Sequence, residues 1–306
     1  MLINELIQLY FYVSEIYEED LQWHCERFTK NQVLPDFTDA ELLTTYLFAM
    51  SYEQKIRMKN IHTYIKRHWS SWFPKMPSYV AYNTRINRLA AVFPRLVQLL
   101  IHKYNADGQN PNLLIKLTDS MPIITCSGRR KAKVARELCD KGYNSTKKMH
   151  YFGVKLHATG FARCGTLPKI DCLQLSAASR HDLEAQRNLL EDSHGIAVVA
   201  DKAFCDEDLS NHLKSIDSEL ITPVKYKKGQ VLQDKQRHKA ADDLYSTAVS
   251  RIRQPIESLF NWLIEHTDIQ RAAKVRSTKG LIVHVFGRIA AALIPNFINS
   301  AMSFSS

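Results

Sequence analysis

The spacing of apolar side chains predicts helices in the first third of the chain and a mixture of strands and helices afterwards. From Leu2 to about Lys103, apolar residues recur three and four positions apart, which is the period of an amphipathic helix. Beyond Asn112 the pattern changes to short apolar runs bounded by Gly, Pro and Asp, which are typical of buried strands. We therefore expect a helical region followed by a mixed α/β layer architecture.

The predicted strands and helices of the second part alternate along the chain. Short apolar runs predict strands over residues 113–117, 151–158, 170–175, 196–200 and 220–224. Helical spacing predicts helices over residues 182–190, 206–213 and 242–264. The dense cluster of turn-forming residues over 105–112 marks a domain boundary. We therefore expect one domain over residues 1–111 and a second over residues 112–306.

Local signals predict where two helices of the first part begin. Thr38 and Glu41 have the spacing of a capping box, in which each side chain accepts a hydrogen bond from a free backbone N–H. Pro74 and Pro77 interrupt the helical pattern and Ser78 restarts it, which predicts a helix over residues 79–100.

The order of elements around this break fits a helix-turn-helix, in which the second helix enters the major groove of DNA. In the second helix we expect Tyr82, Arg85 and Arg88 on the exposed turns, while Ile86 and Leu89 face inward. Arg85 and Arg88 are therefore candidate contacts to DNA.

The net charge narrows the class of partner. The 306 residues include 41 Lys and Arg against 31 Asp and Glu, a net charge of +10, with 45% hydrophobic residues. This composition supports a buried core and excludes a disordered polar tail, a collagen-like repeat and a coiled coil. A basic surplus favours a polyanionic partner, with nucleic acid first and an anionic membrane second.

Several other classes of protein are not supported. The first twenty residues contain no Lys or Arg, unlike a signal peptide, and polar residues interrupt the apolar stretch over 281–298, where we expect a buried helix. Six scattered cysteines without a C-x-x-C pair are expected to be small core residues in a reducing cytoplasm. No zinc, ATP or dinucleotide motif occurs in the sequence.

Three acidic residues are candidate metal ligands. Asp119 and Asp201 each follow a predicted strand, and ligand sites in open α/β sheets lie at the carboxyl ends of strands. Glu257 lies beside the apolar stripe of the predicted late helix. Three carboxylates at one sheet surface would hold two Mg²⁺ or Mn²⁺ ions for phosphodiester chemistry. The alternative is that each acid is a cap or turn residue after a strand.

Two basic segments flank these acids in the sequence. Residues 125–157 contain nine Lys or Arg against two acids, and residues 225–239 form a second basic cluster. Such segments either bind DNA phosphates or are solvated surface loops. The candidate phosphate contacts that they supply are Arg129, Arg130, Lys131, Lys133, Lys227 and Lys228.

Five segments in order give the chain a resemblance to a known family. They cover residues 117–122, 151–157, 179–182, 199–204 and 253–260. Together they resemble the bacterial insertion-sequence transposases of the DDE superfamily, whose catalytic domain has the ribonuclease H-like fold. The fold class implied is an α/β mixed sheet flanked by helices, preceded by an all-α DNA-binding region.

The resemblance also implies a function. Asp119, Asp201 and Glu257 would bind the metal ions for cleavage and strand transfer at the ends of the element. The partners implied are double-stranded DNA, as terminal inverted repeats and target, and further copies of the chain assembled on it.

One departure from the family pattern concerns the third acid. Many relatives surround it with a Tyr, Arg, Glu, Lys signature, of which only the spacing of Arg253 and Glu257 survives, since Ser250 and Ile264 stand at the other two positions. Arg253 and the neighbouring Arg251 are further candidate DNA contacts.

Three alternatives remain open from the sequence. The first is a ribonuclease H-like nuclease that cuts DNA or RNA without strand transfer. The second is a non-catalytic DNA-binding repressor derived from a transposase. The third is a basic α/β protein whose acids are turn residues.

Overall fold

The computed structural model describes residues 2–25, 35–106, 112–129, 133–144, 147–226 and 232–303. The chain divides into two compact units. Unit 1 comprises Met1–Ala106, Lys133–Glu137 and Leu263–Ser306, and unit 2 comprises Asp107–Ala132 and Leu138–Trp262. The C-terminal residues therefore belong to the same compact unit as the N-terminal helices. A functional division at residues 111 and 112 stays a prediction.

Unit 1 is helical. Its N-terminal helices are α1 (Leu2–Glu19), the 3₁₀ turn η1 (Leu21–His24), α2 (Asp39–Ser51), α3 (Met58–His68), α4 (Tyr79–Arg88) and α5 (Val92–Ala106). Its C-terminal helices are α9 (Thr278–Ile282), the π-helical turn η3 (Val283–Gly287) and α10 (Arg288–Ser303).

The predicted helix starts are confirmed, and one predicted helix is wrong. Thr38 and Glu41 form the capping box that begins α2, and the Ser78 side chain caps α4. The helix predicted over residues 79–100 is instead two helices, α4 and α5. Pro94 explains the break, because proline lacks the N–H that a helix interior requires and is tolerated only in a first turn, here that of α5.

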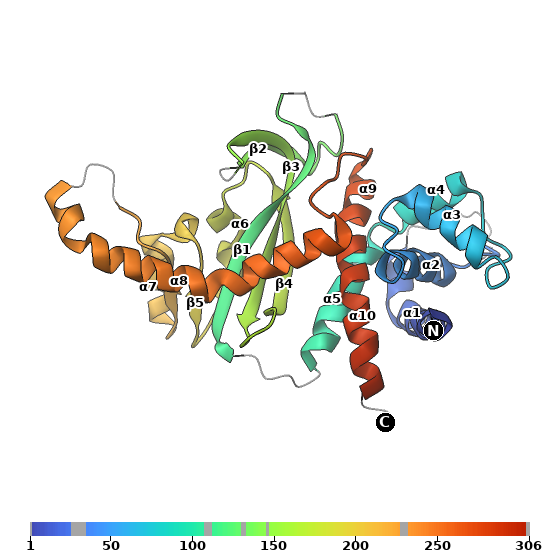
Figure 1. Ribbon diagram of the computed structural model, residues 1–306, viewed down its shortest axis with the longest axis horizontal. Helices are drawn as coiled ribbons and strands as arrows, with labels where there is room; N and C mark the ends of the chain where they lie inside the picture. Colours follow the sequence, from blue (N-terminus) through green and yellow to red (C-terminus); the bar gives the residue numbers. More distant parts are fainter. Residues whose placement is uncertain are drawn as a thin grey trace. The chain divides into compact units, whose positions relative to one another are not determined.

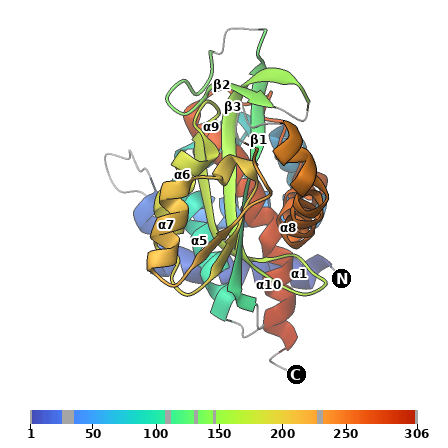
Figure 2. The ribbon, with the colours of Figure 1, turned by 90° about the vertical axis from the view of Figure 1, so that its left-hand side faces the viewer.

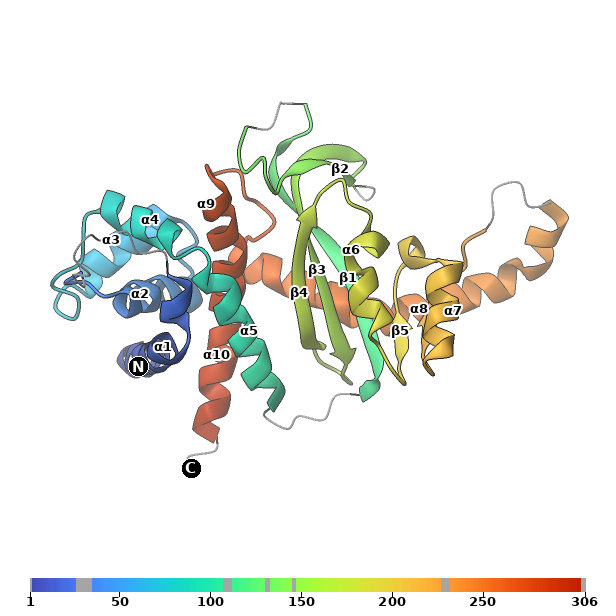
Figure 3. The same cartoon turned by 180° about the vertical axis from the view of Figure 1, so that it is seen from behind.

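The core of unit 1 joins residues from both ends of the chain. Helix α10 packs against α2 and α5, beside which it lies in Figure 3. The Ser51 hydroxyl donates to the Ala291 carbonyl at 2.7 Å, and the Arg288 guanidinium donates to the Ile56 carbonyl at 2.9 Å. Gly287 is required at its position, because a Cβ there would lie 2.6 Å from the Tyr46 phenol oxygen.

The apolar stretch near the C-terminus is helical and mostly buried, as expected. Residues 278–295 are long and apolar enough to cross a membrane by length and composition, but 67% of that stretch is buried inside the structure. This burial is typical of a core helix. The prediction for the cysteines is wrong at two positions, because Cys164 and Cys205 are exposed.

Unit 2 is built on a mixed sheet (Figure 1). Its strands are β1 (Asn112–Ser127), β2 (Asp140–Asn144), β3 (Met149–Ala162), β4 (Lys169–Ala177), β5 (Ala197–Val199) and β6 (Glu219–Ile221). The strand order is β2-β3-β1-β5-β6, with β4 also paired to β3. Strands β1, β3 and β4 are antiparallel neighbours, whereas β5 and β6 run parallel to β1. The predicted ribonuclease H-like α/β fold is confirmed.

Helices cover both faces of this sheet, as Figure 2 shows. Helices α6 (Asp182–Glu191) and α7 (Glu207–Ser215) lie on one face, and α8 (Leu232–Thr267) lies on the other. Leu190, Val198, Leu209 and Leu213 form a buried cluster beneath α6 and α7. On α8 the buried side chains Ile256, Leu259 and Phe260 carry the packing, so α8 is anchored as an element of the core.

A buried chain of hydrogen bonds lies on the α6 face of the sheet. Thr118 donates to Gln186 Oε1 at 2.5 Å, and the Gln186 amide lies 3.1 Å from His157 Nδ1. His157 Nε2 lies 2.7 Å from the Ser176 hydroxyl, which donates to the Ala177 carbonyl. The chain runs in one direction when His157 is neutral with its proton on Nε2, and every member then has a partner.

This series of hydrogen bonds through His157 predicts that the free energy of unfolding falls in acid. Burial is the main cause that lowers the pKa of His157 to about 4, and Lys155 and Arg180 add to it against the attraction of Asp182. Because the unfolded histidine titrates near ~6.5, protonation favours unfolding below that pH. We expect the free energy of unfolding to fall by up to roughly 3 kcal/mol between pH 6.5 and 4 through this residue, measured by urea unfolding.

Two variants isolate the contribution of His157. His157→Gln should show a shallower decline with acid than the wild type, whereas His212→Gln, which changes an exposed histidine, should follow the wild type. His284 in unit 1 has its pKa lowered to about 3, mainly by burial, and contributes to the slope of all three proteins. Equal slopes for His157→Gln and wild type would contradict the assignment.

Candidate active site

Asp119 lies within β1, not at its end. The sequence predicts a strand that closes before Asp119, and this expectation is wrong because β3 pairs with β1 along nearly its whole length and extends it to Ser127. The parallel pairing of β1 with β5, in contrast, ends at Leu117. Asp119 therefore marks the point where β1 loses its parallel neighbour.

Asp201 lies at the matching position beside β5. Leu117 pairs with Val199, and Asp119 and Asp201 each follow two residues later, so the register brings the two acids to adjacent positions. Asp201 caps the short 3₁₀ helix η2 (Lys202–Phe204) and accepts a hydrogen bond from the Ala203 N–H at 2.7 Å. This bond holds one carboxylate oxygen and leaves the side chain at the carboxyl end of β5.

Arg253 bridges Asp119 and Glu257. Its Nη1 donates to Asp119 Oδ2 at 2.6 Å, and its Nη2 donates to Glu257 Oε1 at 2.5 Å. The side chains of Arg253 and Asp119 are 15% and 17% exposed, and that of Glu257 is 39% exposed. Arg253 and Glu257 are one turn apart on α8 and share a face of the helix. One guanidinium therefore bridges a strand carboxylate and a helix carboxylate.

The electrostatics of Asp119 reflect this crowding. Burial is the largest cause that raises the pKa of Asp119 to about 7, and the nearby carboxylates of Asp201 and Glu257 raise it further. Arg253 and the Ser120 N–H oppose this shift, since both stabilise the charged form. The single positive charge of Arg253 does not offset the burial of Asp119 and the repulsion from its neighbours.

The donor chemistry of these residues suits a hard divalent cation. Asp119, Asp201 and Glu257 offer only carboxylate oxygens, the ligands that Mg²⁺ and Mn²⁺ prefer. Arg253 shows that a cation is already accommodated between two of them. Among the residues that the structure describes, no three acidic, histidine or cysteine side chains converge closely enough to hold one metal ion. Asp119, Asp201 and Glu257 are therefore neighbours, but their described side chains do not form a complete metal-binding site.

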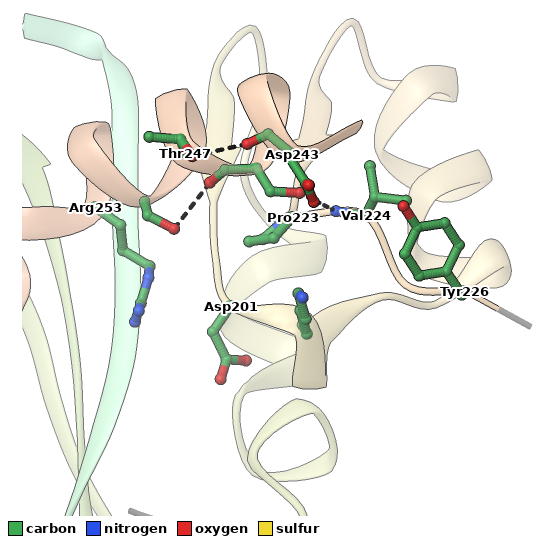
Figure 4. Close-up of a pocket in the computed structure, with 10 residues that line it drawn as sticks. Asp201, Pro223, Val224, Tyr226, Asp243, Thr247 and Arg253 are labelled. Atoms are coloured by element: carbon green, nitrogen blue, oxygen red, sulfur yellow. Dashed lines mark hydrogen bonds between the residues drawn. The ribbon is translucent and has the colours of Figure 1, made fainter. Parts of the chain in front are cut away.

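A cavity of about 550 Å³ adjoins the acids (Figure 4). Asp201 and Arg253 line one end of it. The middle of α8, over residues 243–250, and the segment that follows β6 supply most of the remaining wall. The candidate site therefore has a hollow beside it, large enough for part of a substrate.

The fold and these acids define a ribonuclease H-like protein with a carboxylate site. Residues 110–277 match the family described as Transposase DDE domain. The match covers more than half of the 306 residues, so the chain belongs to this transposase family. Enzymes of this family act on DNA and generally use divalent metal ions. No curated protein and no solved structure matches the chain.

The predicted DNA contacts fall into three groups. Arg88, Arg129, Lys133 and Arg251 are exposed. Arg253 is held by the acids, and Arg85 is held inside unit 1 by Asp39 and the Phe37 carbonyl, both at 2.6 Å. Arg130, Lys131, Lys227 and Lys228 lie outside the described residues. The assignment of all ten to DNA binding stays a prediction.

The structure also corrects the exposed face predicted for α4. Tyr82 is fully buried, with its ring against His62 and its hydroxyl 3.2 Å from that of Thr45. Arg85, only 17% exposed, lies on the same side one turn later. The face of α4 expected to be exposed is therefore largely internal.

The sequence contains a further signal, beyond its motifs, for a basic surface in unit 1. Residues 54–106 contain ten Lys or Arg and no Asp or Glu. Helix α3 presents much of this charge, since Arg57 precedes it and Lys59, Lys66 and Arg67 lie along it, all exposed. The absence of acidic residues from this segment, together with its Lys and Arg, is the sequence signal for this surface.

Replacement of Arg253 tests its role as counter-charge. In Arg253→Met the carboxylates of Asp119 and Glu257 lose their only described ion-pair partner. We expect a loss of about 1–3 kcal/mol in the free energy of unfolding in EDTA, between the values for exposed and buried pairs. Mg²⁺ should stabilise this variant more than the wild type, because added cations replace the missing charge. Urea unfolding with and without Mg²⁺ measures both effects.

The matched control is Arg251→Met, which removes an exposed arginine from the same helix. It should change stability by less than about 0.5 kcal/mol. If Arg253→Met behaves like this control, the bridge does not stabilise the site.

Proposed function

We propose that the protein is a DNA transposase that cuts phosphodiester bonds at the ends of an insertion sequence and joins the resulting 3′-hydroxyls to target DNA. The observation that supports this best is the position of Asp119 and Asp201 on adjacent strands with Glu257 joined to Asp119 through Arg253. The family match spans the same residues. The reaction would take place on DNA in the cytoplasm, with copies of the chain assembled on the two ends.

In this proposal Asp119, Asp201 and Glu257 hold two Mg²⁺ or Mn²⁺ ions. Ions bound there would polarise the scissile phosphodiester and stabilise charge on the attacking and leaving oxygens. The chain itself supplies fixed carboxylates, since the Ser120 N–H donates to Asp119 at 2.8 Å and the Ala203 N–H donates to Asp201. Preorganised ligands lower the cost of assembling the site.

Arg253 has a second role in this proposal as a phosphate contact. Its Nε is buried and has no hydrogen-bond partner among the described residues. A buried donor without an acceptor is costly in free energy. A phosphate oxygen of the DNA would supply the missing acceptor, so Arg253 would position the substrate as well as the acids.

We further propose that α3 binds DNA phosphates outside the catalytic site. Lys59, Lys66 and Arg67 are exposed on a helix without acidic residues. Lysine and arginine that neutralise phosphates release bound counterions, which gives affinity without sequence preference. The residues that read the terminal repeats would then lie on neighbouring elements of unit 1.

The catalytic proposal predicts the effect of isosteric changes at the acids. Asp119→Asn, Asp201→Asn and Glu257→Gln should each lower Mg²⁺-dependent cleavage by on the order of a thousandfold or more, because a neutral amide is a poor ligand for a hard cation. DNA affinity in EDTA should stay within about threefold of the wild type, because these residues contribute no positive charge. Cleavage of the DNA that flanks the gene, mapped at nucleotide resolution, provides the rates.

Asp208→Asn is the matched control, because it changes an exposed carboxylate on α7. It should cleave at the wild-type rate. Full activity in any of the three site variants would remove that residue from the site. A joining assay with pre-cleaved ends separates a transposase from a nuclease, and DNA binding without cleavage in any divalent ion would indicate a repressor.

The basic surface predicts a change in salt dependence. Lys59→Gln and Lys66→Gln should each weaken DNA binding uniformly across sequences and reduce the slope of log affinity against log salt by about one. Fluorescence anisotropy between low and physiological salt measures the slope. Lys214→Gln, an exposed lysine on α7, should leave it unchanged. An unchanged slope in the α3 variants would show that DNA does not contact this face.

A further inference from the structure

Helix α4 has one face that is firmly anchored in unit 1. On this face the Tyr82 hydroxyl lies 3.2 Å from that of Thr45 on α2, and the Arg85 guanidinium donates to the Asp39 carboxylate at 2.6 Å. Ile86 is fully buried on the same side. These contacts fix the rotation of α4 about its axis, so the opposite face is presented to solvent in one orientation.

The exposed face of α4 carries small apolar groups and no acid. Val80, Ala81, Thr84 and Arg88 are exposed, and the spacing of four residues places Val80, Thr84 and Arg88 in one row along the helix. The Val80 side chain is 71% exposed. The methyl groups of Val80, Ala81 and Thr84 therefore form a small apolar patch in contact with water, whose burial by a ligand would be favourable.

The surroundings of this patch are basic. Helix α3 lies beside α4 (Figures 1 and 3), and His62 of α3 holds the two together, because its Nε2 lies 2.9 Å from the Pro77 carbonyl just before α4. Helix α3 carries exposed Lys and Arg, and residues 54–106 contain no Asp or Glu. This charge favours a polyanion as the ligand that covers the patch.

The major groove of DNA matches both features. It admits an α-helix, and thymine presents its C5 methyl group there, where valine, alanine and threonine methyl groups make apolar contacts. In helices that read this groove, residues near the N-terminus contact the base edges. Val80 and Ala81 lie in the first turn of α4 and Thr84 lies in the second. The phosphates on either side of the groove suit the cations of α3.

We infer that the exposed face of α4 reads thymine methyl groups in the major groove at the ends of the element, with Val80 as the main contact. The inference rests on the proposed function, because it takes DNA as the partner. Arg85 is held inside unit 1 by Asp39, so of the two arginines of α4 only Arg88 is exposed to contact DNA. Sequence preference then comes chiefly from apolar contacts, while α3 supplies affinity for phosphates.

Replacement of thymine by uracil tests this contact, because uracil lacks only the C5 methyl group. Fragments of the DNA that flanks the gene carry uracil at a random fraction of thymine positions and are bound in EDTA. Bound and free fractions are cleaved with uracil-DNA glycosylase and alkali and compared at nucleotide resolution. For the wild type, uracil should lower affinity about fourfold at one or a few positions, the effect of burying one methyl-sized group.

Variants at position 80 assign the contact to α4. Val80→Ser should reduce the effect of uracil to less than about 1.5-fold at one of these positions, whereas Val80→Ile, which remains apolar, should keep it. Ile3→Ser is the matched control, because it changes an exposed apolar residue on α1, and it should show the wild-type pattern. Lys66→Gln should weaken binding to all fragments without changing the pattern.

The outcomes separate this inference from the proposed function. If the wild type binds and cleaves the fragments but uracil has no effect, or if Val80→Ser keeps the full effect, the inference is overturned and the catalytic proposal stands. If uracil has the expected effect but no fragment is cleaved in Mg²⁺ or Mn²⁺, the α4 contact is supported and the catalytic proposal fails. Absence of DNA binding overturns both.

A second copy of the chain is the competing occupant of this face. Analytical ultracentrifugation of the DNA-free protein distinguishes it, because Val80→Ser would weaken a contact between copies. We expect the wild type and Val80→Ser to have the same mass in solution. A lower mass for Val80→Ser would assign the face to self-association and overturn the inference.

Discussion

The bridge between Arg253 and two carboxylates is the interaction on which the site of unit 2 depends. Asp119 comes from a strand and Glu257 from a helix, and Arg253, which bridges them, is 134 residues from Asp119 in the sequence. Burial is the main cause that raises the pKa of Asp119, and repulsion from the carboxylates of Asp201 and Glu257 raises it further. A positive charge between these acids offsets this repulsion, and the guanidinium of Arg253 supplies one.

The position of Asp119 follows from the pairing of β1. Strand β3 pairs along nearly all of β1, whereas β5 pairs with only its first part. The edge of β1 beyond Leu117 is therefore free of a parallel neighbour at the point where Asp119 stands. The same register brings Asp201 beside it, so two acids separated by 82 positions in numbering become adjacent through three backbone pairs.

The net charge of the chain conceals a separation of charges. The first twenty residues are acidic and contain no Lys or Arg, while residues 54–106 contain no Asp or Glu. In unit 2 the acids occupy the sheet surface, and the candidate DNA contacts Arg129 and Arg251 are exposed on the same unit. Such local contrast lets a protein attract a polyanion and still concentrate cations at a few carboxylates.

Much of the fold was readable from the sequence, because helix and strand periods and the capping residues Thr38 and Ser78 act locally. The three acids were also identifiable as candidates from their neighbours in the chain. The local pattern predicts one helix across Pro94, where the structure has two. It also predicts an exposed Tyr82, which is buried, because burial depends on which elements pack together.

The sequence by itself determined the α/β class, the order of the elements and the residue types available for chemistry. Only the tertiary structure decided that β1 continues past Asp119, that Arg85 is used inside unit 1, and that Arg253 joins Asp119 to Glu257. These features depend on contacts between residues far apart in the chain. No local period or propensity encodes such contacts, because their energies arise only when the elements pack.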